Sequence, residues 1–143
     1  RKTQLAVLGL PPYSAAIIKV TLTDSVSASC GFMTLGTYDT IGDSQYGASF
    51  GIIDYSTKDT DASGNVTVTT GNFSDTMDVD VIIETSRFAQ VKSVLTSVRS
   101  TPSVWITEEN TEGTIVYGFF REFDIIMTNP TVSLCTLQIE GLT

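Results

Sequence analysis

The chain has 143 residues, a length that suits one domain with a hydrophobic core of its own. Hydrophobic residues make up 41% and charged residues 17%, which excludes a disordered chain, and no apolar run is long enough to cross a bilayer. The formal net charge of −8 argues against nucleic acid as a partner, because phosphate contacts need clustered lysine and arginine.

The first residue is Arg1 rather than methionine, which indicates either that a segment has been removed or that the stretch belongs to a longer protein. No signal peptide is visible. Residues 1–14 contain Pro11, Pro12 and Tyr13, and adjacent prolines favour an extended segment. We expect an extended N-terminal arm over residues 1–14, which either reaches a neighbouring subunit or packs on its own domain.

Residues 15–143 are expected to form a single β domain. The first two strand candidates are residues 15–22 and 26–35, which are rich in isoleucine, valine and threonine. Residues 36–47 contain three glycines and little periodicity, which predicts a loop long enough to be an interaction site.

Residues 48–57 and 66–70 are predicted to form a hairpin, with Gly64-Asn65 in the turn. The turn contains the sequence from Asp59 to Gly64, which matches the start of an EF-hand loop, so Asp59, Asp61 and Ser63 are weak calcium-ligand candidates. The twelfth loop position is Thr70 instead of glutamate, and the flanks are strands. An ordinary solvated turn is therefore the preferred interpretation.

Residues 73–84 alternate between apolar and polar side chains, which predicts a strand that is buried on one face. The period then changes to that of a helix over about residues 86–99, with Thr85 or Ser86 as the N-cap and Pro102 beyond the end. The helical apolar stripe should pack on the sheet. It comprises Phe88, Val91, Val94, Leu95 and Val98.

Residues 115–127 form the longest predicted strand, and Asn129-Pro130 begins a turn into a closing strand over residues 132–139. On strict alternation, one face of the long strand is almost wholly apolar and should contact the core. That face comprises Ile115, Tyr117, Phe119, Arg121, Phe123, Ile125 and Met127. These elements predict a mainly β fold, an antiparallel sandwich or partly closed barrel with one helix packed on the sheet.

No conventional active site is visible. Histidine is absent, which removes the Ser-His-Asp and Cys-His arrangements and most zinc sites. Paired carboxylates of a glycosidase are conceivable among Glu108, Glu109 and Glu112 or between Asp78 and Asp80, although surface solvation is the default for all five. We expect no enzymatic activity and no cofactor.

Cys30 and Cys135 both lie in apolar, strand-like runs. The two cysteines could form a disulfide, but two isolated buried thiols are the simpler interpretation. Arg121 interrupts an apolar face, so it is expected near the sheet margin with its stem on the core, or in an ion pair between subunits.

The second half of the chain resembles virion proteins of tailed bacteriophages, particularly minor tail proteins of the tail tip and distal tail. In those proteins a strand leads into a helix, a short strand, a turn, a "YG" strand and a final strand. The matching pieces are the helix at 88–102, SVWI at 103–106, VYGFFREFDI at 116–125 and NPTVSLCTLQIEGLT at 129–143. The resemblance covers roughly the last seventy residues and does not identify one protein.

The resemblance implies a non-enzymatic structural subunit of the virion tail, tail tip or baseplate, assembled in the host cytoplasm. It implies a ring of copies, a hexamer or trimer, in contact with neighbouring tail proteins and with neither nucleic acid nor membrane. The interface candidates are Pro11, Pro12, Tyr13, Tyr38, Tyr46 and Arg121. The alternative is a carbohydrate-binding or adhesive β-sandwich module that uses Trp105, Tyr38 or Tyr46 as stacking platforms. A carboxylate hydrolase ranks last.

Overall fold

The computed structural model describes residues 4–11, 14–23, 26–109 and 111–142. Their contacts divide them into two units. The first contains residues 4–6 and 41–142, and the second contains the described residues between Val7 and Thr40. Strands account for 41% and helices for 10% of the described residues, and the sheet is antiparallel and strongly curled into a half-barrel. The predicted fold class, mainly β with one helix, is confirmed.

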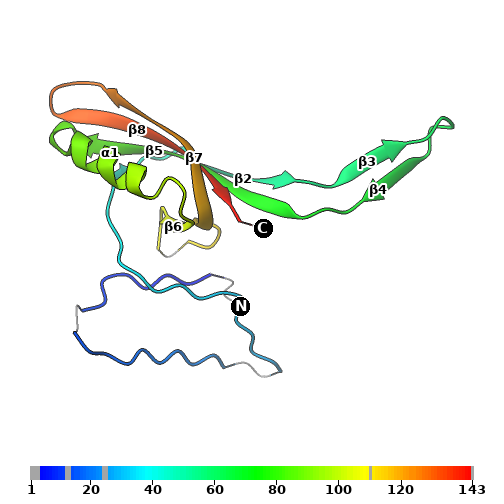
Figure 1. Cartoon of the computed structure of the whole chain (residues 1–143), viewed down its shortest axis with the longest axis horizontal. Coiled ribbons are helices and arrows are strands. Elements are labelled where there is room, and N and C mark those ends of the chain that lie inside the picture. Colours follow the sequence, from blue (N-terminus) through cyan, green and yellow to red (C-terminus); the bar gives the residue numbers. More distant parts are fainter. Residues whose placement is uncertain (1–3, 12–13, 24–25, 110, 143) are drawn as a thin grey trace. The chain divides into compact units, whose positions relative to one another are not determined.

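The main sheet of the first unit has the strand order β1-β5-β8-β7-β6, and β2 also pairs with β5 (Figure 1). All its pairings are antiparallel. Its strands are β1 (Asp43–Ser44), β2 (Ser49–Asp54), β5 (Phe73–Glu84), β6 (Ser103–Ile106), β7 (Ile115–Met127) and β8 (Val132–Gly141). The long strands β5, β8 and β7 lie side by side, so the predicted strands at 73–84, 115–127 and 132–139 are confirmed.

The core lies between one face of this sheet and the helix. A short 3-10 turn η1 (Thr85–Arg87) leads into α1 (Phe88–Ser97), which places the helix within the range expected from the sequence. Val91 and Leu95 of the helical stripe are fully buried. Their sheet partners are Met77, Val79, Val81 and Ile83 of β5, Val116 of β7, and Cys135, Leu137 and Ile139 of β8.

The predicted N-cap is wrong, because the N-cap residues of η1 and α1 are Glu84 and Arg87, and neither makes a side-chain capping hydrogen bond. The Thr85 hydroxyl instead donates to the carbonyl of Asn129 at 3.1 Å and lies 2.8 Å from the buried Ser133 hydroxyl. Asn129 organises the β7–β8 turn, since its side-chain oxygen accepts hydrogen bonds from the backbone of Thr131 and Val132. Thr85 therefore fastens the helix start to this turn.

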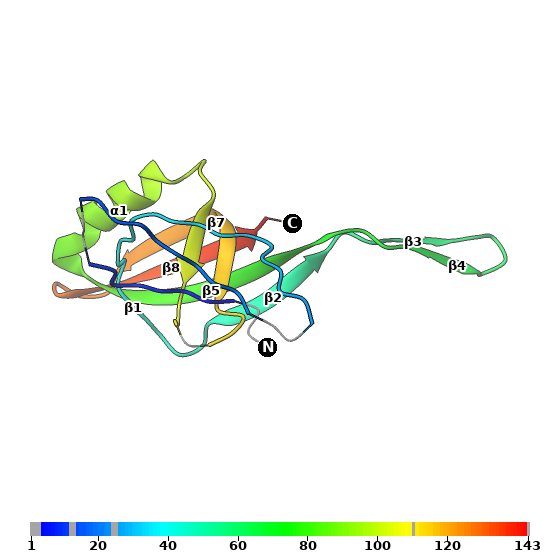
Figure 2. The ribbon, with the colours of Figure 1, turned by 90° about the horizontal axis from the view of Figure 1, so that it is seen from below.

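A hairpin forms here, but its pairing differs from the prediction, because residues 49–54 pair with residues 73–78 and residues 66–69 pair with residues 57–60. Beyond β2 the chain continues as β3 (Thr57–Thr60), turns, and returns as β4 (Val66–Thr69) into β5. Figure 2 shows β3 and β4 continuing the line of β2 and β5 beyond the main sheet. The two ladders are separated near Gly71, where a Cβ would approach the Tyr55 backbone to 2.5 Å.

The predicted core face of β7 is wrong over its first half and at Met127, which is 59% exposed. In the first half of β7, Val116 is buried and Phe120 packs on the core, although the prediction placed both on the opposite face. In the second half, Phe123 and Ile125 pack on the core as predicted. The pairing explains this change, because Phe120 is opposite Ile139 and Glu122 is opposite Gln138. Arg121 is therefore an extra residue, a β-bulge, and it moves the later side chains to the other face.

The strands predicted at 15–22 and 26–35 do not form in the described part of the second unit. A strand needs a partner for its backbone N–H and C=O groups, and no strand pairing in the described part of the chain includes these residues. Their composition favours strands, but pairing decides whether strands exist. Whether residues 15–143 form one domain stays a prediction.

Candidate functional site

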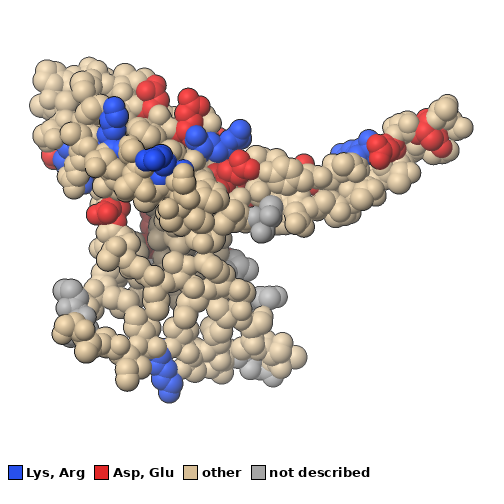
Figure 3. Space-filling view, viewed as in Figure 1, with Lys and Arg blue, Asp and Glu red and all other residues tan. Residues whose placement is uncertain are grey.

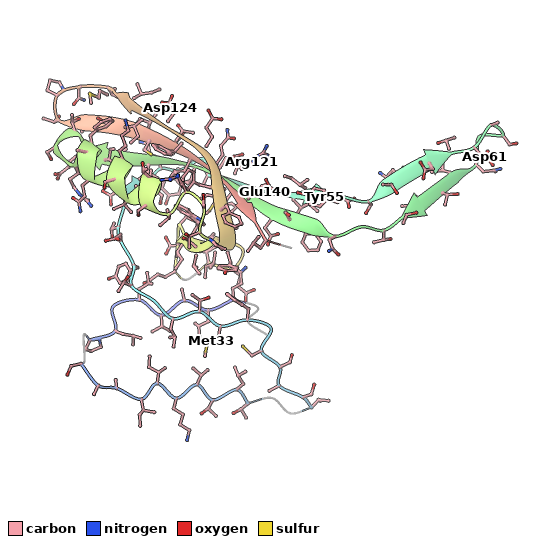
Figure 4. All side chains as sticks on the ribbon, viewed as in Figure 1. Met33, Tyr55, Asp61, Arg121, Asp124 and Glu140 are labelled. Carbon is pink, nitrogen blue, oxygen red and sulfur yellow. The ribbon has the colours of Figure 1, made fainter. Side chains whose placement is uncertain are left out.

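The most distinctive polar cluster lies where the hairpin leaves the sheet. The Tyr55 hydroxyl donates a 2.8 Å hydrogen bond to Oε1 of Glu140, and Nε of Arg121 lies 3.5 Å from its Oε2. Figure 4 shows these three side chains together, with Asp124 further along β7 and Asp61 at the far turn of the hairpin. In the ladder the residue opposite Glu140 is Phe119, and Arg121 follows two positions later as the extra residue of the bulge.

This cluster borders an open hollow of about 650 Å³. Its lining residues are Tyr55, Asn72, Ser74, Phe119, Arg121, Glu140, Gly141 and Leu142. The Arg121 side chain is 61% exposed and that of Glu140 is 29% exposed. An ion pair this exposed contributes only about 0–1 kcal/mol to stability. The guanidinium therefore has capacity to bind a carboxylate of another molecule in a fork geometry.

Next to the hollow, the sheet face opposite α1 is acidic, and we call it the outer face. Two rows of side chains cross three strands here: Glu122, Gln138 and Asp78 in one, and Asp124, Thr136 and Asp80 in the other. The Thr136 hydroxyl donates a 2.7 Å hydrogen bond to Asp80. Figure 3 shows acidic and basic side chains gathered over the sheet body.

Burial beneath the outer face, and the carboxylates of that face, raise the pKa of the Cys135 thiol. Cys135 is fully buried in β8, and burial raises its pKa to about 11, with Asp124 and Asp80 adding to the rise by repelling a thiolate. Cys30 is exposed in the second unit, and both cysteines are free. The expectation of two buried thiols is thus correct for Cys135 and wrong for Cys30, because no strand buries the run around Cys30.

Large apolar side chains are unusually exposed in two regions. In the second unit they are Val7, Leu10, Ile17, Ile18, Val20, Leu22, Val26, Phe32, Met33, Leu35 and Tyr38. Along the hairpin they are Phe50, Ile52, Tyr55, Val66, Val68 and Phe73. Exposed apolar surface of this extent marks an interaction site, because isolated soluble proteins rarely leave so much in water.

The interface candidates from the sequence are not gathered in one place. Pro11, Tyr38 and Tyr46 are exposed, Tyr38 at 59% and Tyr46 at 109% relative accessibility. Tyr38 belongs to the second unit and Tyr46 to the first. Pro12 and Tyr13 lie outside the described residues. Arg121 alone joins a defined cluster.

The start of the chain is tied to the first unit through Gln4. Its side-chain amide donates to the carbonyl of Ile115 at 3.0 Å, and its side-chain oxygen accepts from the Gly113 backbone N–H at 3.0 Å. The N-terminal arm is thus fixed locally at this residue, one of the two alternatives the sequence left open.

Of the weak calcium candidates, Asp59 lies in β3, and Asp61 and Ser63 form hydrogen bonds within the hairpin turn. The Asp61 carboxylate accepts hydrogen bonds from the backbone N–H of Ser63 and from the backbone and side chain of Asn65, all within 2.9 Å. These bonds lower the pKa of Asp61, with the Asn65 side chain contributing most. Within the described ranges, no three acidic, histidine or cysteine side chains converge as metal ligands would.

The other sequence candidates separate in the structure. Glu108, Glu109 and Glu112 are exposed at the β6–β7 connection, and Asp78 and Asp80 belong to the outer face. Trp105 is half-buried, packs edge-to-face on Phe120 at 6.1 Å between ring centroids, and donates its indole N–H to the Gly118 carbonyl at 3.2 Å. Its ring is committed to the core rather than presented as a platform.

Glu140 and Tyr55 were missed by sequence reasoning. Glu140 is the one acidic residue within β8, and on strict alternation from the buried Leu137 and Ile139 it must point to the outer face. That signal was available in the sequence. The contact of Tyr55 with Glu140 depends on the break in the hairpin ladder between β2 and β3. Residues 54–57 have no sequence pattern that predicts this break.

In the described part of the chain, no helix combines the length and hydrophobicity needed to cross a bilayer. A scan against protein-family models finds no family that matches the chain. A search of curated proteins likewise finds no match.

Proposed function

We propose that this chain is a non-enzymatic structural subunit of a bacteriophage tail, at the tail tip or distal tail, whose copies assemble into a ring. The identity comes from the resemblance of residues 88–143, with their order of helix, short strand, "YG" strand and final strand. Fold alone does not determine function, so the proposal needs support from the molecule's surface.

The observation that supports self-association is the apolar exposure of the second unit. Ile17 is 98% exposed and Val26 is 92% exposed, in stretches whose composition favours strands. Leaving such side chains in water costs roughly 1.5–3 kcal/mol each relative to burial. Contact with further copies of the chain would bury them, which is how a ring subunit gains stability on assembly.

Electron microscopy of the purified chain tests the proposal. Closed rings with a uniform number of copies, six or three, are the expected result. Particles no larger than one chain at every concentration would contradict it. Ring-shaped particles that bind purified tail tubes or tips of a phage would support the position in the tail.

The alternative is a carbohydrate-binding or adhesive module, and the exposure of Tyr38 and Tyr46 favours it. Aromatic rings in solvent can stack on sugar rings. A glycan array compares the native chain with the Tyr38→Ala and Tyr46→Ala variants. Binding that disappears in either variant would favour this module, and an array without hits would remove it.

A further inference from the structure

One edge of the main sheet is incomplete. The β7 strand runs from Ile115 to Met127, but β6 pairs with it only between Ile115 and Gly118. From Phe119 to Met127 its single strand partner among the described residues is β8. This leaves one side of a long stretch of backbone without a ladder, and such an edge is a template for an added strand.

The side chains on this stretch divide sharply by face. Phe123 and Ile125 turn toward the core, whereas Glu122 and Asp124 lie on the acidic outer face. Ile126, on the outer face beyond Asp124, is 56% exposed. A strand that completes this edge should therefore be apolar on one side. On the other side it should carry a cation opposite Asp124 and an apolar residue opposite Ile126.

Residues 15–22 of this chain have that pattern. One side of the stretch is Ala16, Ile18, Val20 and Leu22, and the other is Ala15, Ile17, Lys19 and Thr21. The stretch forms no strand within the single chain, its residues are exposed, and Lys19 has no ion pair among the described residues. It thus has strand-forming composition, unpaired backbone and the complementary charge.

We propose that residues 15–22 of one copy add to the free edge of β7 in a second copy as an antiparallel strand. The antiparallel direction is preferred because one register satisfies both faces at once. It places Lys19 opposite Asp124, Ile17 opposite Ile126, Ile18 opposite Ile125 and Val20 opposite Phe123. A parallel strand with Lys19 at Asp124 would set Ile17 against Glu122 instead. The inference deepens the proposed function and rests on its claim that copies associate.

Disulfide trapping between copies tests the register. One chain carries Ile17→Cys and a differently tagged chain carries Ile126→Cys, both in a Cys30→Ser background. Residues directly opposite in an antiparallel pair have Cα atoms about 4.5–5.5 Å apart, within the range of a disulfide. The expected result is a covalent dimer of the two tagged chains. Ile52→Cys, exposed on β2 at the other sheet edge, is the matched control that should not cross-link.

Charge reversal supplies an independent readout. Lys19→Glu or Asp124→Lys should weaken association about three- to tenfold, because a favourable cross-strand pair of opposite charges becomes a pair of like charges that opposes pairing. The double reversal should restore most of the affinity. Lys58→Glu, the same charge change on β3, should leave association unaltered.

Each outcome has a distinct meaning. Rings that form without cross-linking and without response to Lys19→Glu would overturn the strand addition and leave the proposed function standing. A chain carrying both Ile17→Cys and Ile126→Cys that forms its disulfide as a monomer would overturn exchange between copies. Absence of any association in every variant and in the native chain would refute both proposals.

Discussion

At the level of single residues, close backbone contacts explain why position 118 requires glycine. Gly118 of the "YG" strand lies opposite Gly141 of β8. A Cβ on Gly118 would overlap the carbonyl oxygen of Glu140 and approach the Gly141 Cα to 2.6 Å. Glycine at this position is needed for the close approach of β7 and β8, not for an unusual φ.

Gly118→Ala is therefore expected to destabilise the fold. Overpacking against fixed backbone costs about 1–3 kcal/mol, because neither strand can move without disturbing the ladder. Urea unfolding followed by circular dichroism measures the change. Gly36→Ala is the control, since a Cβ there meets nothing within 4 Å. Equal stability of the two variants would contradict the close packing.

The two cysteines should differ in reactivity. The pKa of Cys135 is raised to about 11 by burial and by the nearby Asp124 and Asp80, so almost no thiolate exists near neutral pH. A thiol reagent at pH 8 should label Cys30 at once and Cys135 only after unfolding. Mass spectrometry of digested protein identifies the labelled site. Rapid native labelling of Cys135 would show that β8 is not buried as described.

The raised pKa also predicts how stability depends on pH. The folded state holds the Cys135 proton more tightly than the unfolded state, whose ordinary value is 9.0. The associated stability is complete below pH 9 and is lost as pH rises toward about 11. In Cys135→Ala this alkaline loss should be smaller, as urea titrations at several pH values will measure. An unchanged pH profile in that variant would exclude Cys135 as its source.

At the scale of elements, the bulge at Arg121 decides which face of β7 meets the core. Before it, Val116 and Phe120 pack inward, and after it Phe123 and Ile125 do. One extra residue thus lets two incompatible apolar patterns contribute to the same core. The side chain of Arg121 itself lies at the exposed hollow, so the insertion and the side chain have separate roles.

Deleting Arg121 should be far more damaging than truncating it. Without the bulge, one half of β7 must present its apolar residues to solvent, and losing burial of Phe123 and Ile125 costs about 3 kcal/mol or more. Arg121→Ala removes only an exposed ion pair and should change stability by less than about 1 kcal/mol. Denaturant unfolding compares both with the native chain. Similar stability of all three would refute the bulge assignment.

The hairpin turn depends on Asp61. Replacing it by alanine removes the acceptor for the N–H groups of Ser63 and Asn65, so β3 and β4 should lose hydrogen-exchange protection while the main sheet keeps it. The pKa of Asp61 is lowered below 3.8, so this support is present above that pH and lost as pH falls below it. Asp59→Ala on β3 is the control, and equal fraying there would contradict the role of Asp61.

The sequence predicted those elements whose local pattern of apolar residues matches the face that they bury. The alternation of residues 73–84 and the helical stripe around Val91 and Leu95 both led to the observed elements. The bulge could not be predicted, because alternation assumes one residue per ladder position. The Arg121–Glu140–Tyr55 cluster joins residues of β7, β8 and the connection after β2. Strand register brings them together, and the sequence pattern of each segment alone does not reveal that register.

At the scale of the whole chain, residues 15–22 and 26–35 are where sequence and structure disagree most. Their composition favours strands, yet the described residues there form none and expose their apolar side chains. Local preference without a pairing partner cannot make a strand. The disagreement is resolved if the partner is another copy, which links the failed strand prediction to the proposed ring.

Sedimentation velocity of the purified chain across a wide concentration range tests whether copies of the chain associate. We expect a discrete assembly of several copies that dissociates on dilution, with residues 15–22 gaining hydrogen-exchange protection in the assembled state. A single species of 15.4 kDa at every concentration, with those residues still exchanging freely, would contradict it.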